Sequence, residues 1–480
     1  MCDIAIVGAG VVGAMLAREL SKYQLRVVLL EKENDVACGA SKANSGIIHG
    51  GFDPEPGTLK ATLNVQGIDL MYQACEELHV PHRRNGSMVL AFAPEEEPAI
   101  RALYERGKVN GIGDLQLLTG EEARALEPNL SEKVTLALLS PSAGIVCPYE
   151  LTIAAVGSAM KNGVELRRNF TLSSVEKQEN YILRSAEGET VEAAFVCNCA
   201  GGYSDRVARM VGDESFTVIP RAGEYMLLDK SPLVDHTIFQ VPTKEGKGIL
   251  VTPTVDGNIL TGPTACRVDT PENTETTPAG LDIVKRLAAK SVPTVDFRQV
   301  ITSFTGVRAS EAGGDFIIAP SAAAERFVNV AAIDSPGLTS CVAIARYAVN
   351  VLRECGADLR EKESWDGTRE DPHAFRHMTP EEKNAFVREH PDYGRIICRC
   401  ETVSKGEILH AIRTEPKPRD VDGVKRRTRA GMGRCQGGFC LPYVMKLLAE
   451  EQNIPLSAVT KNGGKSVYTY EEAGDRHGNA

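Results

Sequence analysis

The first thirty residues constrain the fold more than any other part of the chain. Residues 4–7 form a short apolar run of the kind that is buried in a parallel sheet. Residues 11–23 then place apolar side chains at helical spacing, and residues 26–30 form a second apolar run. This order predicts a βαβ unit, and therefore an α/β domain built around a mostly parallel sheet.

Three glycines, Gly8, Gly10 and Gly13, separate the first predicted strand from the helix with G-x-G-x-x-G spacing. The first permits a tight turn, the second lets a pyrophosphate approach the backbone, and the third lets the helix pack closely on the strand. The helix N-terminus offers N–H groups and a partial positive charge to phosphates. Glu31 follows the second strand, where an acid can bind ribose hydroxyls. These features predict a dinucleotide site, and the acid favours NAD or FAD over NADP.

The size and charge of the chain narrow its possible functions. A chain of 480 residues is long enough for about two to four domains. The net charge of −10 disfavours general nucleic-acid binding. No apolar run reaches the roughly 18 residues of a membrane span, and the N-terminal sequence lacks the basic region of a signal peptide. We therefore expect a cytoplasmic protein with no nucleic-acid partner and no direct membrane span, in which the 13 cysteines stay reduced.

Later segments of the chain resemble those of a known family. The stretch "CGASKANSGIIHGGFDPEPGTLKA" (38–61) resembles the flavin-facing segment of the D-amino-acid-oxidase-like FAD superfamily. Within that superfamily it is similar to the FAD-dependent glycerol-3-phosphate dehydrogenases and to the L-2-hydroxyglutarate dehydrogenases. Further segments that resemble the family follow in the family's order at residues 141–151, 193–205, 219–228, 248–265, 304–310 and 331–352. The resemblance implies that the dinucleotide is FAD, bound to a Rossmann-like domain.

The resemblance also implies which residues contact the FAD. They are Gly8, Gly10, Gly13, Glu31, Ser45, Gly46, Ala200, Gly201, Asp334, Gly337, Leu338 and Thr339. Around the last four, an apolar run ends at Asp334, and a helix is predicted to begin near residue 339 or 340. The N-terminus of this helix would stabilise the negative charge of a reduced flavin, and Asp334 would bond a ribityl or ribose hydroxyl.

The residues between the FAD-binding segments predict a second domain. Residues 82–140 and 216–300 contain short strand-like runs separated by Gly, Pro and Asp. One stretch, "GILVTPTVDGNILTGP", is typical of a β-hairpin that turns at Asp256-Gly257. We therefore expect a mainly antiparallel substrate domain over the flavin, and an α/β (α+β) fold for the chain as a whole.

Arginine and tyrosine candidates for the catalytic site lie in the later segments. Arg308 lies in "GVRAS", which resembles a family turn that directs an Arg to a substrate carboxylate or phosphate, although Ala309 replaces the usual Pro. Arg suits this role because its donors bind such groups bidentately, and the alternative is a structural salt bridge. Arg221 and Tyr225, in "PRAGEY", either face the substrate or lie at a solvated strand edge.

His49 and Lys60 are the other catalytic candidates. Small residues flank His49 in "SGIIHGG", so it is a candidate flavin contact, general base or covalent flavin anchor. Lys60, in "PGTLKA", resembles a family Lys near the flavin. In the expected reaction, hydride passes from the substrate carbon to flavin N5, His49 takes the hydroxyl proton and Arg308 holds the anionic group. Arg binds both phosphate and carboxylate, so the sequence leaves this choice open.

Four cysteines near the C-terminus follow a metal-ligand pattern. Cys398 and Cys400 form a C-x-C pair, Cys435 and Cys440 form a C-x4-C pair, and a helical pattern follows each pair. Zinc commonly takes C-x2–4-C pairs, disulfides are disfavoured in the cytoplasm, and iron–sulfur clusters also take four Cys. The pattern resembles the bacterioferritin-associated-ferredoxin-like domain of anaerobic-type glycerol-3-phosphate dehydrogenases. This resemblance implies that the four cysteines hold a [2Fe-2S] cluster, with zinc as the alternative.

Positive charge gathers around these cysteines. Residues 395–440 contain 11 Lys or Arg and five Asp or Glu, a net charge of +6, and include the run "KRRTR" at 425–429. Positive charge stabilises the reduced form of an anionic cluster. We therefore expect this basic run to tune the cluster or to dock a partner, with nucleic-acid binding as the alternative.

A highly charged stretch separates the two cofactor regions. It is predicted to carry one short helix, with Thr379 as its cap, Pro380 at its first position and Glu382 three residues after the cap. The lone Trp365 is expected to hold this stretch to a domain. The expected domains are a discontinuous FAD-binding domain (1–81, 141–215 and 301–358), a substrate domain (82–140 and 216–300), a charged linker (359–394), a [2Fe-2S]-binding domain (395–460) and a tail (461–480).

The residues and the resemblance together predict an FAD-dependent dehydrogenase for a small anionic hydroxy compound. Glycerol 3-phosphate, oxidised to dihydroxyacetone phosphate, is the expected substrate because the cysteine domain matches that family. L-2-hydroxyglutarate or another 2-hydroxy acid is the alternative, since "SGIIHGG", "PGTLKA" and "SPGLT" resemble that branch. The cluster would pass single electrons to another subunit or to a quinone-linked partner, through which any membrane association would occur. A non-catalytic electron carrier or redox sensor is the alternative from another class.

Overall fold

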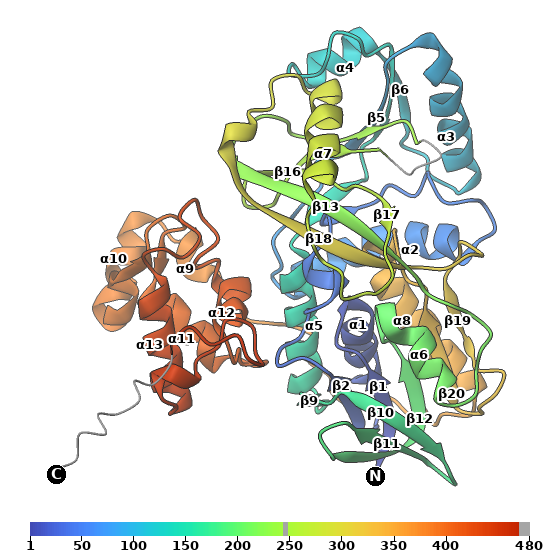
Figure 1. The fold of residues 1–480 in the computed structure, drawn as a ribbon, viewed down its shortest axis with the longest axis vertical. Helices are drawn as coiled ribbons and strands as arrows, with labels where there is room; N and C mark the ends of the chain where they lie inside the picture. Colours follow the sequence, from blue (N-terminus) through green and yellow to red (C-terminus); the bar gives the residue numbers. More distant parts are fainter. Residues whose placement is uncertain (243–247, 470–480) are drawn as a thin grey trace, which may run out of the picture. The chain divides into compact units, whose positions relative to one another are not determined.

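The computed structural model of the chain describes residues 1–242 and 248–469 (Figure 1). The chain forms two compact units: the first comprises residues 1–32 and 36–369, and the second comprises residues 33–35 and the chain from 370 onward. Part of the predicted tail therefore lies outside the described residues. In the described ranges, the helices are all too short or too polar to cross a membrane.

A largely parallel sheet forms the centre of the first unit, as the first thirty residues predicted. β1 (Cys2–Val7) lies between β2 (Val27–Glu31) and β12 (Thr190–Asn198) and is parallel to both. β9 (Glu165–Arg168) continues the parallel order beside β2, and β20 (Phe327–Ala331) continues it beside β12. The side chains of β2 and β20 are buried along their whole length, as expected for strands covered on both faces.

Helices pack on this sheet and on one another (Figure 1). α1 (Val11–Leu20) packs against α5 (Pro148–Lys161) and α8 (Gly337–Glu354), and α8 also packs against α2 (Leu59–Glu77). The same sheet also contains β10 (Leu172–Lys177), β11 (Tyr181–Ser185) and β19 (Ile317–Pro320). A separate small sheet consists of β3 (Ile47–Ile48), β8 (Gly144–Val146) and β4 (His82–Arg83), and α6 (Ser204–Arg209) follows β12. The helix α8 therefore packs beside α1, the helix that follows the glycine turn, in the first unit.

Two helix boundaries differ from the sequence prediction. α1 ends at Leu20, three residues before the predicted end. α8 begins at Gly337 rather than near residue 339 or 340. The physical reason is that the carbonyl of Pro336 already accepts the Ser340 N–H, at 3.1 Å, so the helix begins directly after the proline.

A second sheet in the first unit is antiparallel except for the pairing of β5 with β14. Its long strands β13 (Ile219–Lys230) and β18 (Val300–Ser310) pair with each other. The predicted hairpin is confirmed, because β15 (Leu250–Pro253) and β16 (Asn258–Gly262) are joined at Gly257, which has a φ of +86°. The remaining elements here are β5 (Ser87–Ala91), β6 (Gln116–Thr119), β7 (Leu136–Ser140), β14 (Thr237–Gln240), β17 (Cys266–Arg267), α3 (Glu97–Val109), α4 (Gly120–Leu126) and α7 (Pro278–Ser291).

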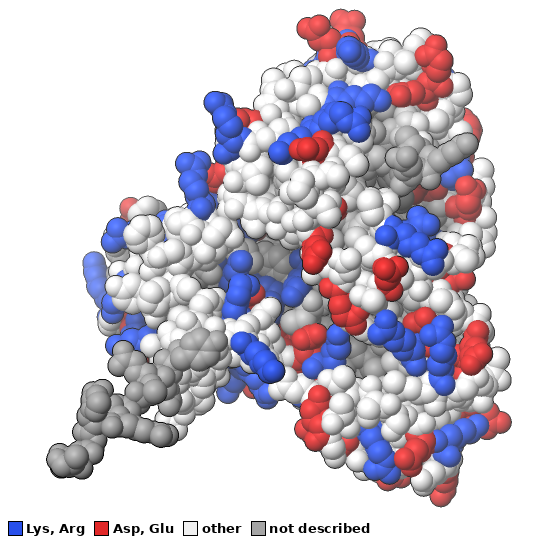
Figure 2. All heavy atoms as spheres, viewed as in Figure 1, with Lys and Arg blue, Asp and Glu red and all other residues white. Residues whose placement is uncertain are grey.

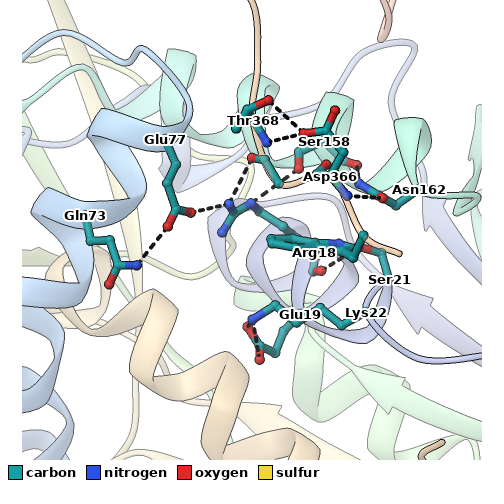
Figure 3. A network of polar contacts seen from close by, with 12 residues as sticks. Arg18, Glu19, Ser21, Lys22, Gln73, Glu77, Ser158, Asn162, Asp366 and Thr368 are labelled. Carbon is teal, nitrogen blue, oxygen red and sulfur yellow. Dashed lines mark hydrogen bonds and ion pairs between the residues drawn. The ribbon is translucent and has the colours of Figure 1, made fainter. Parts of the chain in front are cut away.

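The first part of the charged stretch folds onto the first unit. Trp365 Nε1 donates a hydrogen bond to Ser21 Oγ at 2.9 Å, and the Arg18 and Lys22 cations each lie 5.1 Å from the centre of the indole ring. Arg18 also forms an ion pair with Glu77 at 2.6 Å (Figure 3). Trp365 therefore holds this stretch to the end of α1, which bears out its expected role.

The second unit is mostly helical. Its elements are α9 (Ala374–His377), α10 (Pro380–Glu389), β21 (Ile396–Cys398), β22 (Val403–Ser404), α11 (Lys405–Arg413), α12 (Val421–Thr428) and α13 (Leu441–Gln452). α10 begins with the predicted capping box, in which Thr379 and Glu382 each accept the other's backbone N–H. The rings of Phe375, Phe386 and Tyr393 pack together, so the second part of the charged stretch is folded as well.

A short segment from the N-terminal part of the chain also belongs to the second unit. Asp35 is fully buried there and forms ion pairs with Arg426 at 2.6 Å and with Arg427 at 2.8 Å. Burial raises the pKa of the Asp35 carboxyl, but the two guanidiniums outweigh burial and hold the pKa well below its usual value. These arginines come from the basic run that was expected to tune the cluster or dock a partner. Because they are buried and paired, they stabilise the fold and are not available to dock a partner.

Candidate nucleotide site and cysteine centre

The glycine turn after β1 has the geometry that its spacing predicted. Gly8 has a φ of +105°, and a Cβ atom at Gly13 would lie 2.0 Å from the Gly8 carbonyl oxygen, so both positions require glycine. Gly10 is the N-cap of α1, and the N–H of Val11 donates to Ser41 Oγ at 2.8 Å. Among the described atoms beyond its own helix, only Ser41 Oγ lies within 4 Å of a Cβ built on Gly10. The helix N-terminus is therefore open to a phosphate.

Glu31 and the end of β12 flank the glycine turn. Glu31 Oε2 accepts the N–H of Ala9 at 2.8 Å, so the acid also fixes the conformation of the turn. A Cβ on Gly8 would lie 2.5 Å from the carbonyl oxygen of Cys199, which shows how closely the two strand ends approach. Residues 200–201, which were expected to contact FAD, therefore lie directly beside the turn.

A buried amide network that the strand patterns did not predict holds the end of β12. Asn198 donates to Asn329 Oδ1 at 2.9 Å, and Asn329 donates to Asp213 Oδ2 at 2.9 Å. Asn198 also donates to the Ser204 carbonyl at 2.8 Å, which connects the strand to the turn that follows. A signal was present in the sequence, because each Asn is the single polar residue of an apolar run, 193–200 or 327–333, and such residues are buried only with partners.

The flavin-facing segment predicted after β2 lies against the start of α8. The N–H of His49 donates to Thr339 Oγ1 at 2.8 Å, and His49 Nε2 lies 3.2 Å from Ser335 Oγ. Gly337 and Leu338 form the first turn of α8 beside these contacts. The structure therefore brings a catalytic candidate from one segment together with three cofactor-binding candidates from another.

Lys60 and Asp334 form an ion pair at the same end of the sheet. Lys60 Nζ lies 2.6 Å from Asp334 Oδ1, and the two side chains are only 15% and 18% exposed. Ser310 Oγ donates to Asp334 Oδ2 at 2.9 Å, and Asp315 accepts the backbone N–H of Lys60 at 2.9 Å. A residue expected to bond a sugar hydroxyl and a residue expected to lie near the flavin are thus direct partners.

Tyr225 joins the second sheet to the flavin-facing segment. Its Oη lies 3.1 Å from Ser45 Oγ, and its ring stacks on Phe304 with a centroid distance of 4.9 Å. Burial raises the pKa of the Tyr225 phenol, although Arg308 lowers it in part, so the phenol stays protonated at neutral pH. Gly46, next to Ser45, has a φ of +65°, and a Cβ there would lie 2.6 Å from a backbone oxygen of β8.

Arg308 and Arg221 lie directly opposite each other on β18 and β13. Opposite residues of antiparallel strands share one face, and like charges in such positions repel. Arg308 Nη2 donates to the Thr264 carbonyl at 2.8 Å. Within residues 1–242 and 248–469, no carboxylate pairs with either guanidinium. The two side chains are therefore suited to binding an external anion.

The four C-terminal cysteines lie close together in the second unit as two pairs. Cys400 Sγ and Cys435 Sγ are 3.5 Å apart, and Cys398 and Cys440 are hydrogen-bonded to each other. In the described part of the chain, no three His, Cys, Asp or Glu side chains close around a single ion. Two thiol pairs match a [2Fe-2S] cluster, in which each iron takes two Cys. The residues present therefore fit such a cluster.

In each pair, the environment favours the thiolate, the form that binds metals, on one cysteine: the pKa values of Cys398 and Cys435 are lowered, whereas those of their partners Cys440 and Cys400 are raised. Burial raises the pKa of the Cys435 thiol, but Cys400 and the backbone N–H groups of residues 437–439 outweigh burial and lower the pKa. The hydrogen bond with Cys440 lowers the pKa of Cys398 despite burial. The glycine-containing loop thus brings N–H groups to the sulfur of Cys435.

A buried ion pair lies next to the cysteine centre. Arg429, from the basic run, contacts Glu401 with an Nε–Oε2 distance of 2.9 Å, and both side chains are almost completely buried. Glu401 directly follows Cys400, and a Cβ on Gly433 would lie 2.4 Å from Cys400 Cβ. The basic run therefore supports the cysteine loop from inside the unit.

Comparisons with known families identify two domains. A family model described as "FAD dependent oxidoreductase" matches residues 3–351. A second model, described as "BFD-like [2Fe-2S] binding domain", matches residues 396–450. These matches confirm FAD and a [2Fe-2S] cluster as the cofactors that the sequence predicted.

Named relatives agree with these matches. The "Glycerol 3-phosphate dehydrogenase" of Caloramator mitchellensis is 43% identical over 96% of this chain and 97% of that protein. The mitochondrial "L-2-hydroxyglutarate dehydrogenase" of Nematostella vectensis is 34% identical over 55% of this chain and 62% of that protein. The FAD-bound structure of L-alpha-glycerophosphate oxidase from Mycoplasma pneumoniae is 32% identical, with a TM-score of 0.74, and the match covers 77% of this chain and 98% of that one. The chain therefore belongs to the family of FAD-dependent oxidoreductases, and it carries a C-terminal BFD-like [2Fe-2S] binding domain.

Proposed function

We propose that the protein is a dehydrogenase that oxidises glycerol 3-phosphate to dihydroxyacetone phosphate and delivers the electrons to a protein or quinone acceptor. The observation that carries the proposal is the placement of Arg221 and Arg308 opposite each other, on the sheet face that Tyr225 connects to the flavin-facing segment. The identity of 43% over 96% of the chain with a protein named glycerol 3-phosphate dehydrogenase supports this substrate.

Arg308 is the proposed anchor for the substrate phosphate. It is half-buried, its Nη2 is fixed by the Thr264 carbonyl, and this atom would lie 3.0 Å from a Cβ built on Gly223. The absence of a side chain at Gly223 therefore leaves room for the guanidinium to extend toward Tyr225. An arginine held in one orientation fixes a bound phosphate, and with it the carbon to be oxidised.

His49 is the proposed base for the substrate hydroxyl. Its backbone is fixed by Thr339, its Nε2 lies 3.2 Å from Ser335 Oγ, and its ring stacks on Phe239 at a centroid distance of 6.0 Å. A ring held in this way keeps one orientation while a proton is taken up at nitrogen. The Lys60–Asp334 pair fixes the neighbouring turn, so the orientation of Ser335 is also restricted.

FAD and the cluster are proposed to bind at the sites that the sequence predicted. Residues proposed to hold FAD are Gly8, Gly10, Gly13, Glu31, Ser45, Gly46, Ala200, Gly201, Asp334, Gly337, Leu338 and Thr339, and the proposed cluster ligands are Cys398, Cys400, Cys435 and Cys440. When bound, FAD supplies an acceptor for two electrons and the cluster supplies one-electron transfer. A route for single electrons favours a dehydrogenase over an oxidase that uses O2.

A second candidate substrate is L-2-hydroxyglutarate. The specific observation in its favour is the 34% identity to a protein named L-2-hydroxyglutarate dehydrogenase, and Arg binds carboxylates as well as phosphates. That match covers 55% of this chain, against 96% for the glycerol 3-phosphate relative. Glycerol 3-phosphate is therefore the first choice.

The direct test is anaerobic reduction of the purified holoprotein. Glycerol 3-phosphate should bleach the flavin absorbance at concentrations where L-2-hydroxyglutarate does not. Bleaching by L-2-hydroxyglutarate alone would show that this compound, rather than glycerol 3-phosphate, is the substrate. Bleaching by neither compound would refute the dehydrogenase assignment and favour a non-catalytic electron carrier or redox sensor.

Arg308→Ala tests the anchor. The variant should keep its FAD but lose about 100-fold or more in kcat/KM, because a charged hydrogen bond to an anion is worth about 1.5–3 kcal/mol and the substrate also loses its orientation. Arg286 is an exposed arginine on α7, so the variant Arg286→Ala is the matched control and should behave like the wild type.

A further inference from the structure

A third arginine continues the row formed by Arg221 and Arg308. Arg267, on β17, pairs directly with Arg221 across the other edge of β13. Because β13 lies between β17 and β18, all three arginines occupy one face of three neighbouring strands. Strands lie about 4.8 Å apart, so the row spans roughly 10 Å. Arg267 was not among the residues that the sequence marked as candidates.

The row is unusual in energetic terms. Like charges placed directly opposite each other on a sheet destabilise the pairing. In the described part of the chain, none of the three guanidiniums pairs with a carboxylate, so the repulsion is not relieved inside this unit. Glu272, five residues after Arg267, contacts Arg206 instead, at 3.7 Å. An anion from solution would relieve the repulsion.

Exposure changes along the row. Arg267 and Arg221 are exposed, whereas Arg308 is half-buried and fixed by the Thr264 carbonyl. The two exposed arginines therefore meet solvent first, and the third is held closer to Tyr225. This order suits the successive capture and seating of a single anionic group.

We propose that Arg267 and Arg221 form an outer anion-binding site that takes up phosphate monoesters before Arg308 seats them. The inference rests on the proposed function for the identity of the substrate. The anion-binding site itself is inferred only from the placement of the three arginines. A phosphate monoester carries about two negative charges at neutral pH and offers three acceptor oxygens, which two adjacent guanidiniums can bind together. A single carboxylate offers only two oxygens and one charge, so the outer site would select phosphate.

The first experiment measures binding without turnover. Inorganic phosphate is titrated calorimetrically into the oxidised holoprotein at low ionic strength, using the wild type, Arg267→Ala, Arg267→Lys and Arg286→Ala. Arg267→Ala should weaken phosphate binding roughly five- to tenfold, Arg267→Lys should retain part of the affinity, and Arg286→Ala should match the wild type. Equal phosphate affinity in Arg267→Ala and Arg286→Ala would overturn the inference.

The second experiment follows capture of the substrate. For Arg267→Ala, kcat/KM for glycerol 3-phosphate should fall more than kcat, and its dependence on salt should be flatter than in the wild type, because the lost charge acts mainly on encounter. An unchanged salt dependence would contradict the outer site. The two proposals can fail separately: a protein that binds phosphate through Arg267 but is not reduced by glycerol 3-phosphate refutes the proposed substrate only. A protein that is reduced by it, with phosphate affinity independent of Arg267, refutes the outer site only.

Discussion

The two units hold their sites by different kinds of interaction. In the first unit, the nucleotide turn depends on glycine geometry and on neutral amides such as Asn198 and Asn329. In the second unit, a buried ion pair between Glu401 and Arg429 lies beside the cysteine loop, and another joins Asp35 to Arg427. Removing one partner of a buried ion pair leaves an uncompensated charge, which costs more than an unmet amide hydrogen bond. The second unit should therefore be the more sensitive to charge removal and to acid, and the first to added volume.

The charged surfaces of the two units also differ. On the face shown in Figure 2, charges of both signs are interspersed over the first unit, whereas Lys and Arg predominate over the second. Arg426, Arg427 and Arg429 contribute little to this surface because they are buried. Arg395 and Arg399, which lie nearer the cysteines in the sequence, are exposed. The basic run thus supports the interior, while other arginines give the second unit its basic surface.

The largest effect is expected from Asp35→Asn. The variant keeps the volume of the side chain but leaves two buried guanidiniums without a counter-charge, which should cost about 3–5 kcal/mol of stability in the second unit. Hydrogen exchange of peptides from α11 to α13 measures this loss separately from the first unit. Asp366→Asn, which breaks an exposed ion pair with Lys161 in the first unit, is the control and should leave exchange nearly unchanged. Comparable losses in both variants would refute the contrast between the units.

Acid should lower the stability of the second unit because of the Asp35 carboxyl. The pKa of Asp35 is lower in the folded state than in the unfolded chain, so its contribution is fully present above about pH 4, the unfolded value. The contribution is lost as pH falls below that value, because the unfolded chain then binds a proton that the folded state does not. Stability of the second unit, measured by denaturant titration between pH 6 and pH 3, should therefore fall more steeply in the wild type than in Asp35→Asn. Parallel curves would show that Asp35 is not the titrating group.

The Asp35 contacts also show where sequence reasoning ends. The βαβ unit and the capping box at Thr379 could be predicted because each is encoded within a few turns of chain. The partners of Asp35 lie almost four hundred residues away, and no local pattern in the sequence specifies them.

The candidate site likewise contains features that the sequence predicted and contacts that it could not predict. The spacing of the glycines and of the cysteines predicted two sites, and the resemblance supplied His49 and Arg308. The Lys60–Asp334 pair depends on how distant elements pack, and the opposition of Arg267 to Arg221 depends on strand register. Register is set by turns and by burial across the whole sheet, so it could not be read from either strand alone.

Added volume should damage the first unit. In Gly13→Ala, the new Cβ would lie 2.0 Å from the Gly8 carbonyl oxygen, so helix and strand must separate at a cost of about 1–3 kcal/mol. We expect the variant to lose FAD on gel filtration while hydrogen exchange in the second unit stays at the wild-type rate. Gly113→Ala is the control, because a Cβ there meets no described atom within 4 Å. Retention of FAD in Gly13→Ala would mean that the turn is not the nucleotide site.

The smallest effect is expected from Ser335→Ala, which removes the hydroxyl 3.2 Å from His49 Nε2. One neutral hydrogen bond is worth about 1 kcal/mol, so kcat should fall roughly fivefold while FAD stays bound. Loss of a partner at the ring nitrogen should also shift the pH dependence of kcat, which a purely structural role would not do. Ser340→Ala is the matched control, because its hydroxyl donates to the Pro336 carbonyl in the same turn and does not contact His49. A shift in the pH profile of Ser335→Ala but not of Ser340→Ala would support His49 as the base. Identical profiles would place His49 outside the proton transfer.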